Sequence, residues 1–211
     1  ADRILVSNHD MDFFYAHTLL VTEPTPCGKL QPLKARWTSK AIHSVVEYSG
    51  FDFQEKPHIL VIRRRLNRDV VNHDELLSAL QSRMPNETIV EFDEHDLPNV
   101  GIDQWRLFMN AKVVVGPHGA GLSNLLACRR GTAVVELLPD VYINPCFMTL
   151  AISLGLEYHP LTMSLVSSDE FGNKTDAERL LESPNRFKLH FQVDANRVAA
   201  IVHGIVASRN M

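Results

Sequence analysis

Cysteine is scarce in this chain of 211 residues, and long apolar runs are absent from it. The three cysteines, Cys27, Cys128 and Cys146, are far apart and have no CxxC spacing, which argues against a zinc site built from thiolates. They permit one disulfide bond at most, so cysteine usage leaves the redox compartment open.

No apolar segment of the sequence approaches the roughly 20 residues of a membrane-spanning helix. No signal peptide opens the sequence either, and its first residue, Ala1, is not a methionine. We therefore expect a piece of a longer protein, with any targeting segment or membrane anchor outside this chain.

The sequence also lacks an excess of basic residues. Its 21 lysines and arginines stand against 25 aspartates and glutamates, which gives a net charge of -4 and a pI of about 6.2. This balance argues against nucleic acid as a partner and requires any anion-binding site to be local. The hydrophobic content of 45% and mean hydropathy of -0.08 are typical of a globular protein with a substantial core.

The first quarter of the chain differs in pattern from the rest. Residues 1–55 contain short apolar pieces, a proline-rich turn and one predicted helix, from Thr38 or Ser39 to Ser49. We interpret them as a connecting segment and residues 56–211 as one domain.

In residues 56–211, apolar strands alternate with amphipathic helices. The expected strands span residues 58–62, 88–92, 113–115, 133–138 and 156–159. The expected helices begin near residues 72, 103, 121, 145 and 194. Strands that are apolar throughout indicate a parallel sheet covered on both faces, so we predict an α/β, doubly wound, Rossmann-like fold. Ligands of such folds lie at the carboxyl ends of the strands, near the switch in strand order.

The segment from Lys112 to Asn124 has the pattern of a strand, a tight turn and a helix start. Its β-branched run stops at Gly116, and Gly119 and Gly121 then open the predicted helix. A helix start presents unpaired N–H groups and a partial positive charge, which suit an anion such as phosphate. Glycines there let a ligand approach the backbone closely. The same pattern also fits a packing turn in any α/β domain.

The strand at residues 58–62 ends in a loop with four arginines within six residues, namely Arg63, Arg64, Arg65 and Arg68. Guanidinium groups match phosphate oxygens in a bidentate way, which makes this loop a candidate diphosphate clamp. The alternative is a solvated basic turn paired with Asp69, Asp74 and Glu75. Because the loop and the glycine turn both follow strands, we expect them to meet at one edge of the sheet.

Two further polar residues lie near these loops. Glu136 is close to the end of an apolar strand, where a carboxylate can accept hydrogen bonds from ribose hydroxyls, although it can equally face water. His118, between Pro117 and Gly119, can donate to a phosphate or stabilise a leaving group. It fits a structural histidine bonded to backbone equally well.

Several catalytic motifs are missing from the sequence. Residues 121–125 lack the second glycine of a nucleophile elbow, which disfavours a hydrolase. The glycines of residues 116–121 do not form the dinucleotide fingerprint, which disfavours an NAD-type oxidoreductase, and no P-loop lysine follows them. His9, Asp10 and Asp12 are more typical of a solvated loop than of a metal site.

Three segments together resemble glycosyltransferase family 61. The family patterns are an apolar strand ending in Ile-Ser-Arg-Arg, a turn with His-Gly-Ala-Gly-Leu-x-Asn, and a strand with Val-Val-Glu-Leu-x-Pro. They correspond here to Ile62–Asn72, Gln104–Asn124 and Gly131–Pro139, with Arg63 in place of the serine.

The resemblance implies a GT-B architecture, with two Rossmann-like domains and the nucleotide sugar held mainly by the C-terminal one. Residues 56–211 would be that C-terminal domain, and residues 1–55 a connecting segment or a remnant of the N-terminal domain. The implied donor-binding residues are Arg64, Arg65, Arg68, His118, Gly119, Ala120, Gly121, Leu122 and Glu136.

The implied reaction is an inverting, metal-independent transfer of N-acetylglucosamine or xylose from a UDP-sugar to a hydroxyl of a protein or glycan, without a further cofactor. We identify no catalytic base, and Asp10 is only a remote candidate. An alternative of another class is a non-catalytic nucleotide-sugar-binding or partner subunit. The sequons at Asn86 and Asn173 permit the lumen of the endoplasmic reticulum or Golgi, if the source is eukaryotic.

Overall fold

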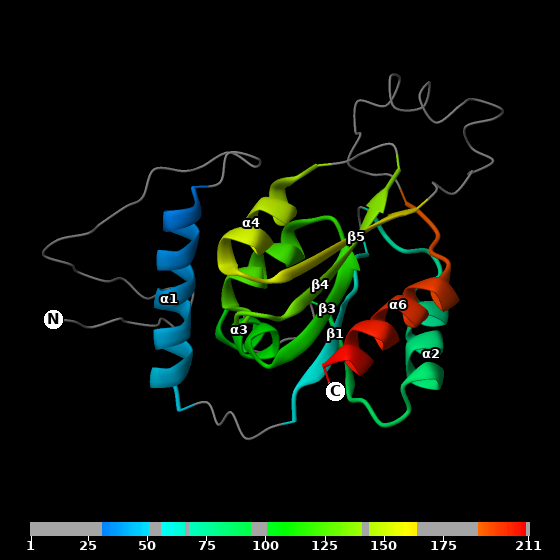
Figure 1. The fold of residues 1–211 in the computed structure, drawn as a ribbon, viewed down its shortest axis with the longest axis horizontal. Coiled ribbons are helices and arrows are strands. Elements are labelled where there is room, and N and C mark those ends of the chain that lie inside the picture. The colour runs from blue at the N-terminus through cyan, green and yellow to red at the C-terminus, as the bar shows by residue number, and fades with distance from the viewer. Residues whose placement is uncertain are drawn as a thin grey trace, which may run out of the picture.

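The computed structural model describes residues 31–50, 56–65, 68–93, 101–140, 144–163 and 190–209. Within them, five parallel strands form one sheet in the order β2-β1-β3-β4-β5 (Figure 1). The strands are β1 (His58–Ile62), β2 (Ile89–Phe92), β3 (Ala111–Pro117), β4 (Ala133–Pro139) and β5 (Glu157–Met163). The predicted α/β class with a parallel, Rossmann-like sheet is confirmed.

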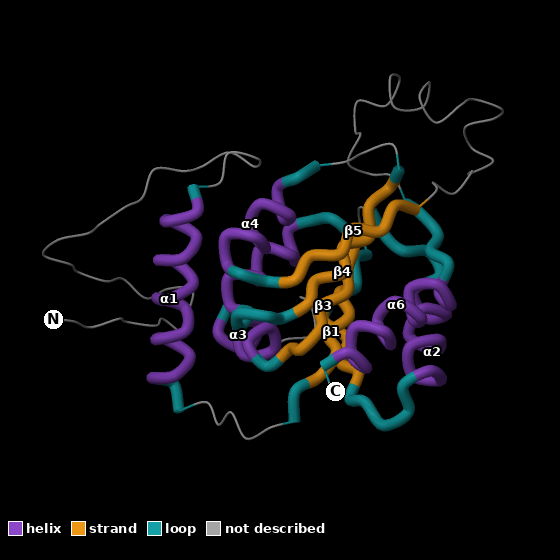
Figure 2. Tube along the Cα trace, in the orientation of Figure 1, coloured by secondary structure: helices purple, strands orange, loops and turns teal. Residues whose placement is uncertain are grey.

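Helices cover both faces of this sheet. They are α1 (Pro32–Tyr48), α2 (His73–Arg83), α3 (Ile102–Met109), the 3-10 helix η1 (Ala120–Ala127), α4 (Cys146–Leu154) and α6 (Ala195–Ser208). Helices α2 and α6 pack on one face, whereas α3, η1 and α4 pack on the other, with α1 outside them (Figure 2).

Strand β1 shows how the core is divided between the two faces. Ile59 and Val61 pack with α2 and α6, whereas Leu60 and Ile62 pack with the helices on the opposite face. Successive side chains of a strand alternate between faces, so an apolar run supplies both cores. Burying each such side chain contributes about 1.5–3 kcal/mol.

Helix α1 begins earlier than the sequence pattern suggests, at Pro32 instead of Thr38 or Ser39. A proline fits the first turn of a helix because its missing N–H group has no intrahelical acceptor there. Ala35 and Val46 of α1 belong to the core formed with α3, η1 and α4. The domain boundary after residue 55 stays a prediction, and α1 belongs to the same packed unit as the sheet.

Two other elements differ from expectation. The helix after the glycines is a 3-10 helix, and β5 continues to Met163 instead of ending at His159. The extension passes through Pro160, which cannot donate a ladder hydrogen bond. An edge strand tolerates this residue, and within the part of the chain that the structure describes β5 pairs only with β4.

His73, the first residue of α2, is buried against β2. Its Nε2 lies 3.1 Å from Oε2 of Glu91, and its side chain is 4% exposed. Burial lowers the pKa of His73 below the ordinary value of 6.5, and the Glu91 carboxylate offsets part of this effect.

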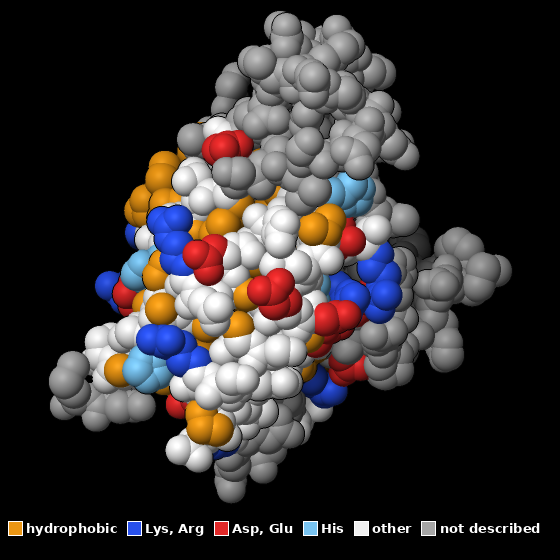
Figure 3. All heavy atoms as spheres, turned by 90° about the vertical axis from the view of Figure 1, so that its right-hand side faces the viewer, with side chains coloured by type: hydrophobic (Ala, Val, Ile, Leu, Met, Phe, Trp, Pro, Cys, Tyr) orange, Lys and Arg blue, Asp and Glu red, His pale blue; other side chains and the backbone are white. Residues whose placement is uncertain are grey.

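The surface over α2 and α6 carries interspersed acidic and basic side chains (Figure 3).

We expect the protein to lose stability as the pH falls through 6.5, because the unfolded chain then protonates His73 while the folded chain does not. Thermal unfolding at pH 7.5 and 5.5 measures this loss. His73→Gln keeps a nitrogen near Glu91 but does not titrate, so its unfolding temperature should depend less on pH. His203→Gln, an exposed change on α6, should keep the wild-type dependence. An identical pH dependence in His73→Gln and wild type would contradict the expectation.

Candidate functional site

The strand order places a switch point between β1 and β3. The chain leaves β1 toward α2 on one face of the sheet and leaves β3 toward η1 on the other. Loops that diverge in this way open a crevice at the carboxyl ends of the two strands, which is where doubly wound folds bind ligands. The arginine loop and the glycine turn follow these two strands.

The glycine turn lies directly against the end of β1. A Cβ atom at Gly116 would lie 2.7 Å from Cβ of Ile62, and one at Gly121 would lie 3.1 Å from Cγ2 of the same residue. A Cβ atom at Gly119 would lie 1.3 Å from Nη1 of Arg64. The expected meeting of the two loops is therefore present in the structure. The backbone of Gly119 is extended, which any residue can adopt. A glycine is needed here because a side chain would collide with Arg64.

The alternation along β1 separates the arginines of the loop. Arg63 points to the α2 face, where Nη1 lies 3.1 Å from Asp74 and 3.5 Å from Glu91. Arg64 points to the opposite face, against Gly119. The alternative of a basic turn paired with Asp74 therefore describes Arg63, whereas Arg64 is the arginine that lies at the glycine turn.

The next arginine of the loop is held by a carboxylate that the sequence reading missed. Nε of Arg65 lies 2.5 Å from Oδ2 of Asp93, whose side chain is 4% exposed. Asp93 directly follows β2, so its place after an apolar strand was the available signal. Arg68 is half-buried and has a positive φ of 55°, an uncommon conformation for a residue with a side chain.

The amide of Leu122, one of the implied donor-binding residues, is already used at the start of η1. The Leu122 amide donates to the Gly119 carbonyl at 2.9 Å, and the Leu122 side chain is fully buried. In a 3-10 helix the amides before this bond have no intrahelical acceptor, and here they are those of Gly119, Ala120 and Gly121. The Leu122 amide is thus engaged in the helix and its side chain in the core, and donor binding by Leu122 stays a prediction.

Glu136 also differs from expectation, because its carboxylate is turned inward. The residue is 0% exposed, and Oε1 lies 2.5 Å from Nδ1 of His118. The hydroxyl of Tyr158 donates to Oε2. Both carboxylate oxygens are engaged inside the protein, so direct contact with ribose hydroxyls does not fit this geometry.

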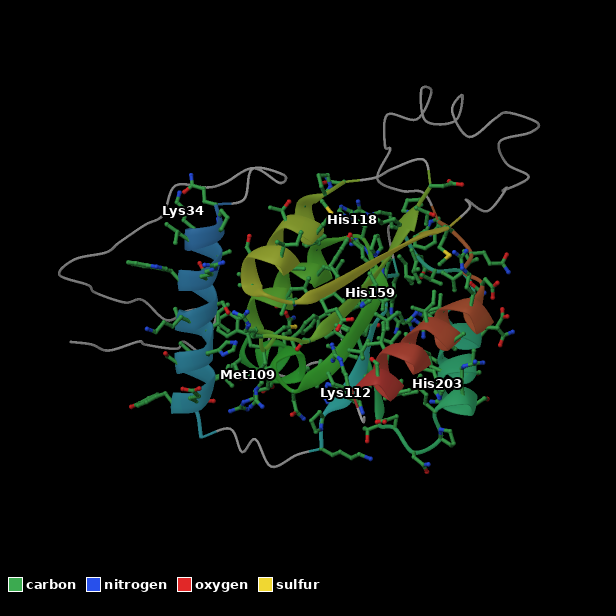
Figure 4. The ribbon with its side chains drawn as sticks, in the orientation of Figure 1. Lys34, Met109, Lys112, His118, His159 and His203 are labelled. Carbon is green, nitrogen blue, oxygen red and sulfur yellow. The ribbon has the colours of Figure 1, made fainter. Side chains whose placement is uncertain are left out.

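His118 lies beyond the end of β3, at the edge opposite Lys112 at the start of the strand (Figure 4). The ring is buried, and its centroid lies 5.0 Å from that of Phe147 on α4. Both interpretations of His118 stay predictions, and the structure adds a contact that neither included, the one between Nδ1 and the side-chain carboxylate of Glu136.

Tyr158 is a further residue that sequence reasoning missed. Burial raises the pKa of its hydroxyl, and the hydrogen bond to Glu136 raises it further, so the group stays a donor. Tyr158 pairs with Val134 in the β4–β5 register, which makes it a diagonal neighbour of Glu136 on one face. This relation depends on register and is invisible in the sequence.

No cluster of three or more potential metal-ligating side chains occurs among the described residues. His9, Asp10, Asp12 and Cys27 lie outside them.

Cys146 is disulfide-bonded, whereas Cys128 is a buried free thiol whose pKa is raised by burial. None of the helices in the described ranges combines the length and apolarity needed to cross a bilayer.

Comparison with known proteins identifies relatives of this chain. The family model described as Glycosyltransferase 61 matches residues 3–135. Human Protein O-linked-mannose beta-1,4-N-acetylglucosaminyltransferase 2 is 36% identical over 117 residues, which cover 53% of this chain and 19% of the relative. Beta-1,2-xylosyltransferase of Arabidopsis thaliana is 28% identical over 128 residues, which cover 51% of this chain and 23% of the relative.

The chain thus spans about a fifth of the length of these relatives. The matched region contains the arginine loop and the glycine turn and ends one residue before Glu136. Since the family model covers more than half of the 211 residues, the resemblance seen in the sequence is confirmed, and the chain belongs to glycosyltransferase family 61.

Proposed function

We propose that this chain is the donor-binding part of an inverting, metal-independent glycosyltransferase. It binds a UDP-sugar whose sugar, N-acetylglucosamine or xylose, is transferred to a hydroxyl of a protein or glycan. The names of the relatives supply the two sugars. The observation that carries the proposal is the guanidinium of Arg64 placed against Gly119 at the switch point of the sheet.

The chemistry of the leaving group explains why these residues suit a UDP-sugar. Displacement at the anomeric carbon leaves negative charge on the diphosphate, and groups that stabilise this charge accelerate the reaction. Arg64 supplies a fixed positive charge with a fork of donors. The amides of Ala120 and Gly121 add neutral donors at the start of η1. A divalent ion becomes dispensable when such groups balance the diphosphate.

The remaining parts of the reaction lie outside the described residues. A base must deprotonate the acceptor hydroxyl, and we propose that another domain of a GT-B architecture supplies it together with the acceptor contacts. Residues 56–211 form the C-terminal half of that architecture in this proposal. Arg65 and Arg68 then belong to the loop that carries Arg64, with Asp93 holding Arg65 in place.

We propose the lumen of the endoplasmic reticulum or Golgi as the location. The disulfide bond of Cys146 is the kind of bond that persists in an oxidising compartment. Asn86, the first residue of a sequon, is exposed in the turn between α2 and β2, where a glycan can be attached.

Titration with UDP by calorimetry tests the donor site. We expect binding that persists in EDTA and that weakens about 10- to 100-fold in Arg64→Ala, the usual effect of losing hydrogen bonds to a charged group. Arg83→Ala is the matched control, because Arg83 is exposed at the end of α2, near the opposite edge of the sheet. Loss of binding in EDTA, or equal affinities in wild type and Arg64→Ala, would contradict the proposal.

A further inference from the structure

Glu136 is a fully buried carboxylate in a strand that is otherwise apolar. Every residue of β4 is buried, and Glu136 itself is 0% exposed. A buried charge is costly unless hydrogen bonds satisfy it. Here a ring nitrogen of His118 and the hydroxyl of Tyr158 satisfy one oxygen each.

The hydrogen bonds of Glu136 determine which nitrogen of His118 carries a proton when the carboxylate is ionised. An ionised carboxylate only accepts hydrogen bonds, so both of its partners must donate. Burial keeps the Tyr158 hydroxyl protonated by raising its pKa, and that hydroxyl donates to Oε2. Nδ1 of His118 must then carry a proton and donate it to Oε1.

The position of His118 makes this constraint relevant to the crevice. Its backbone amide donates to the Leu137 carbonyl at 3.0 Å, and its ring lies against Phe147. The next residue is Gly119, against which the Arg64 guanidinium lies. The orientation of the His118 ring is thus linked through one peptide unit to the turn that leads into η1.

We propose that Glu136 is a positioning residue that acts through His118, holding the tautomer and ring orientation of the histidine and thereby the turn that meets the donor diphosphate. This inference rests on the proposed function. It replaces the ribose contact expected from the sequence with an indirect role for the carboxylate.

The effects of substitutions at Glu136 and His118 on UDP affinity should then be coupled. A double-mutant cycle measures this coupling. We expect Glu136→Leu, which removes both acceptor oxygens, to weaken UDP binding about tenfold. Glu136→Gln keeps one acceptor oxygen and should retain most of the affinity. In a His118→Ala background, Glu136→Leu should add less than about a twofold loss, because its route to the donor is already gone.

Additive losses would overturn the proposal, because they would mean that Glu136 reaches the nucleotide independently of His118. Tyr158→Phe is the matched control, since it removes only the second donor to the carboxylate and should change UDP affinity less than Glu136→Leu does. Far-UV circular dichroism and thermal unfolding of each variant separate loss of the fold from loss of positioning.

Nitrogen-15 NMR of His118 supplies a test that needs no ligand. In the wild-type protein without UDP, we expect the proton on Nδ1, and in Glu136→Leu, which offers no acceptor for that proton, we expect a redistribution between the two ring nitrogens. A wild-type His118 protonated only at Nε2 would overturn the positioning role, even if UDP binds. Failure of UDP to bind a protein with the expected tautomer would instead count against the proposed donor site.

Discussion

Gly119→Ala should weaken UDP binding about a hundredfold, by displacing a charged group and covering backbone donors together. The new Cβ atom would lie 1.3 Å from Nη1 of Arg64, so the guanidinium must leave its position. The methyl group would also stand beside the amide of Ala120, where the diphosphate is proposed to lie. Calorimetric titration of wild type and variant with UDP measures the loss.

The stability of Gly119→Ala should stay close to that of the wild type. The colliding atom is the far end of a flexible side chain, which can rotate away at little cost, and the extended backbone of Gly119 accepts alanine. Gly204→Ala on α6 is the matched control, since a Cβ atom there meets nothing within 4 Å. It should bind UDP as the wild type does.

Combining Gly119→Ala with Arg64→Ala identifies the cause. If the methyl group acts by expelling the guanidinium, the double variant should bind UDP little worse than Gly119→Ala alone. Strictly additive losses would mean that the alanine disturbs some other contact, and the proposed clamp at Gly119 would have to be abandoned.

Gly116→Ala should have the opposite profile, with a loss of about 3 kcal/mol in the free energy of unfolding, at the upper end of the usual cost of overpacking a core. Its Cβ atom would lie 2.7 Å from Cβ and 2.9 Å from Cδ1 of Ile62. No rotation of the Ile62 side chain moves its own Cβ atom. The backbones of β1 and β3 must therefore separate at the centre of the sheet.

Urea unfolding of Gly116→Ala and wild type measures this cost. Gly204→Ala again serves as control and should be equal to or more stable than the wild type, since alanine is the better helix former. A Gly116→Ala variant as stable as the wild type would show that the close packing of Ile62 on this glycine does not restrict the residue at position 116.

Much of the fold was predictable because its signals are local. Strand β1 was predicted at residues 58–62 and has those bounds. A short run of apolar, β-branched residues is typical of a strand buried on both faces. The start of α1 was less accessible. Pro32 can begin a helix or end a loop, and packing of Ala35 and Val46 against the other helices decides between them.

The candidate site divides in a similar way. Arginines after one strand and glycines after another already predicted a common edge of a parallel sheet. The partner of each arginine could not be predicted from the sequence, because it depends on the face of the sheet to which the side chain points. Arg63 and Arg64 are neighbours in the chain, yet one lies toward Asp74 and the other against Gly119.

The sequence by itself determined the family, the parallel α/β fold and the meeting of the arginine loop with the glycine turn, because motif spacing and apolar periodicity are properties of the chain. Only the tertiary structure decided which way Glu136 faces. Strand pairing brings His118 and Tyr158 to its two oxygens. A buried carboxylate needs hydrogen-bond partners, and the tertiary structure determines which groups lie within reach of it. A residue expected to bind the ligand was thereby assigned to hold the residue beside the glycine turn.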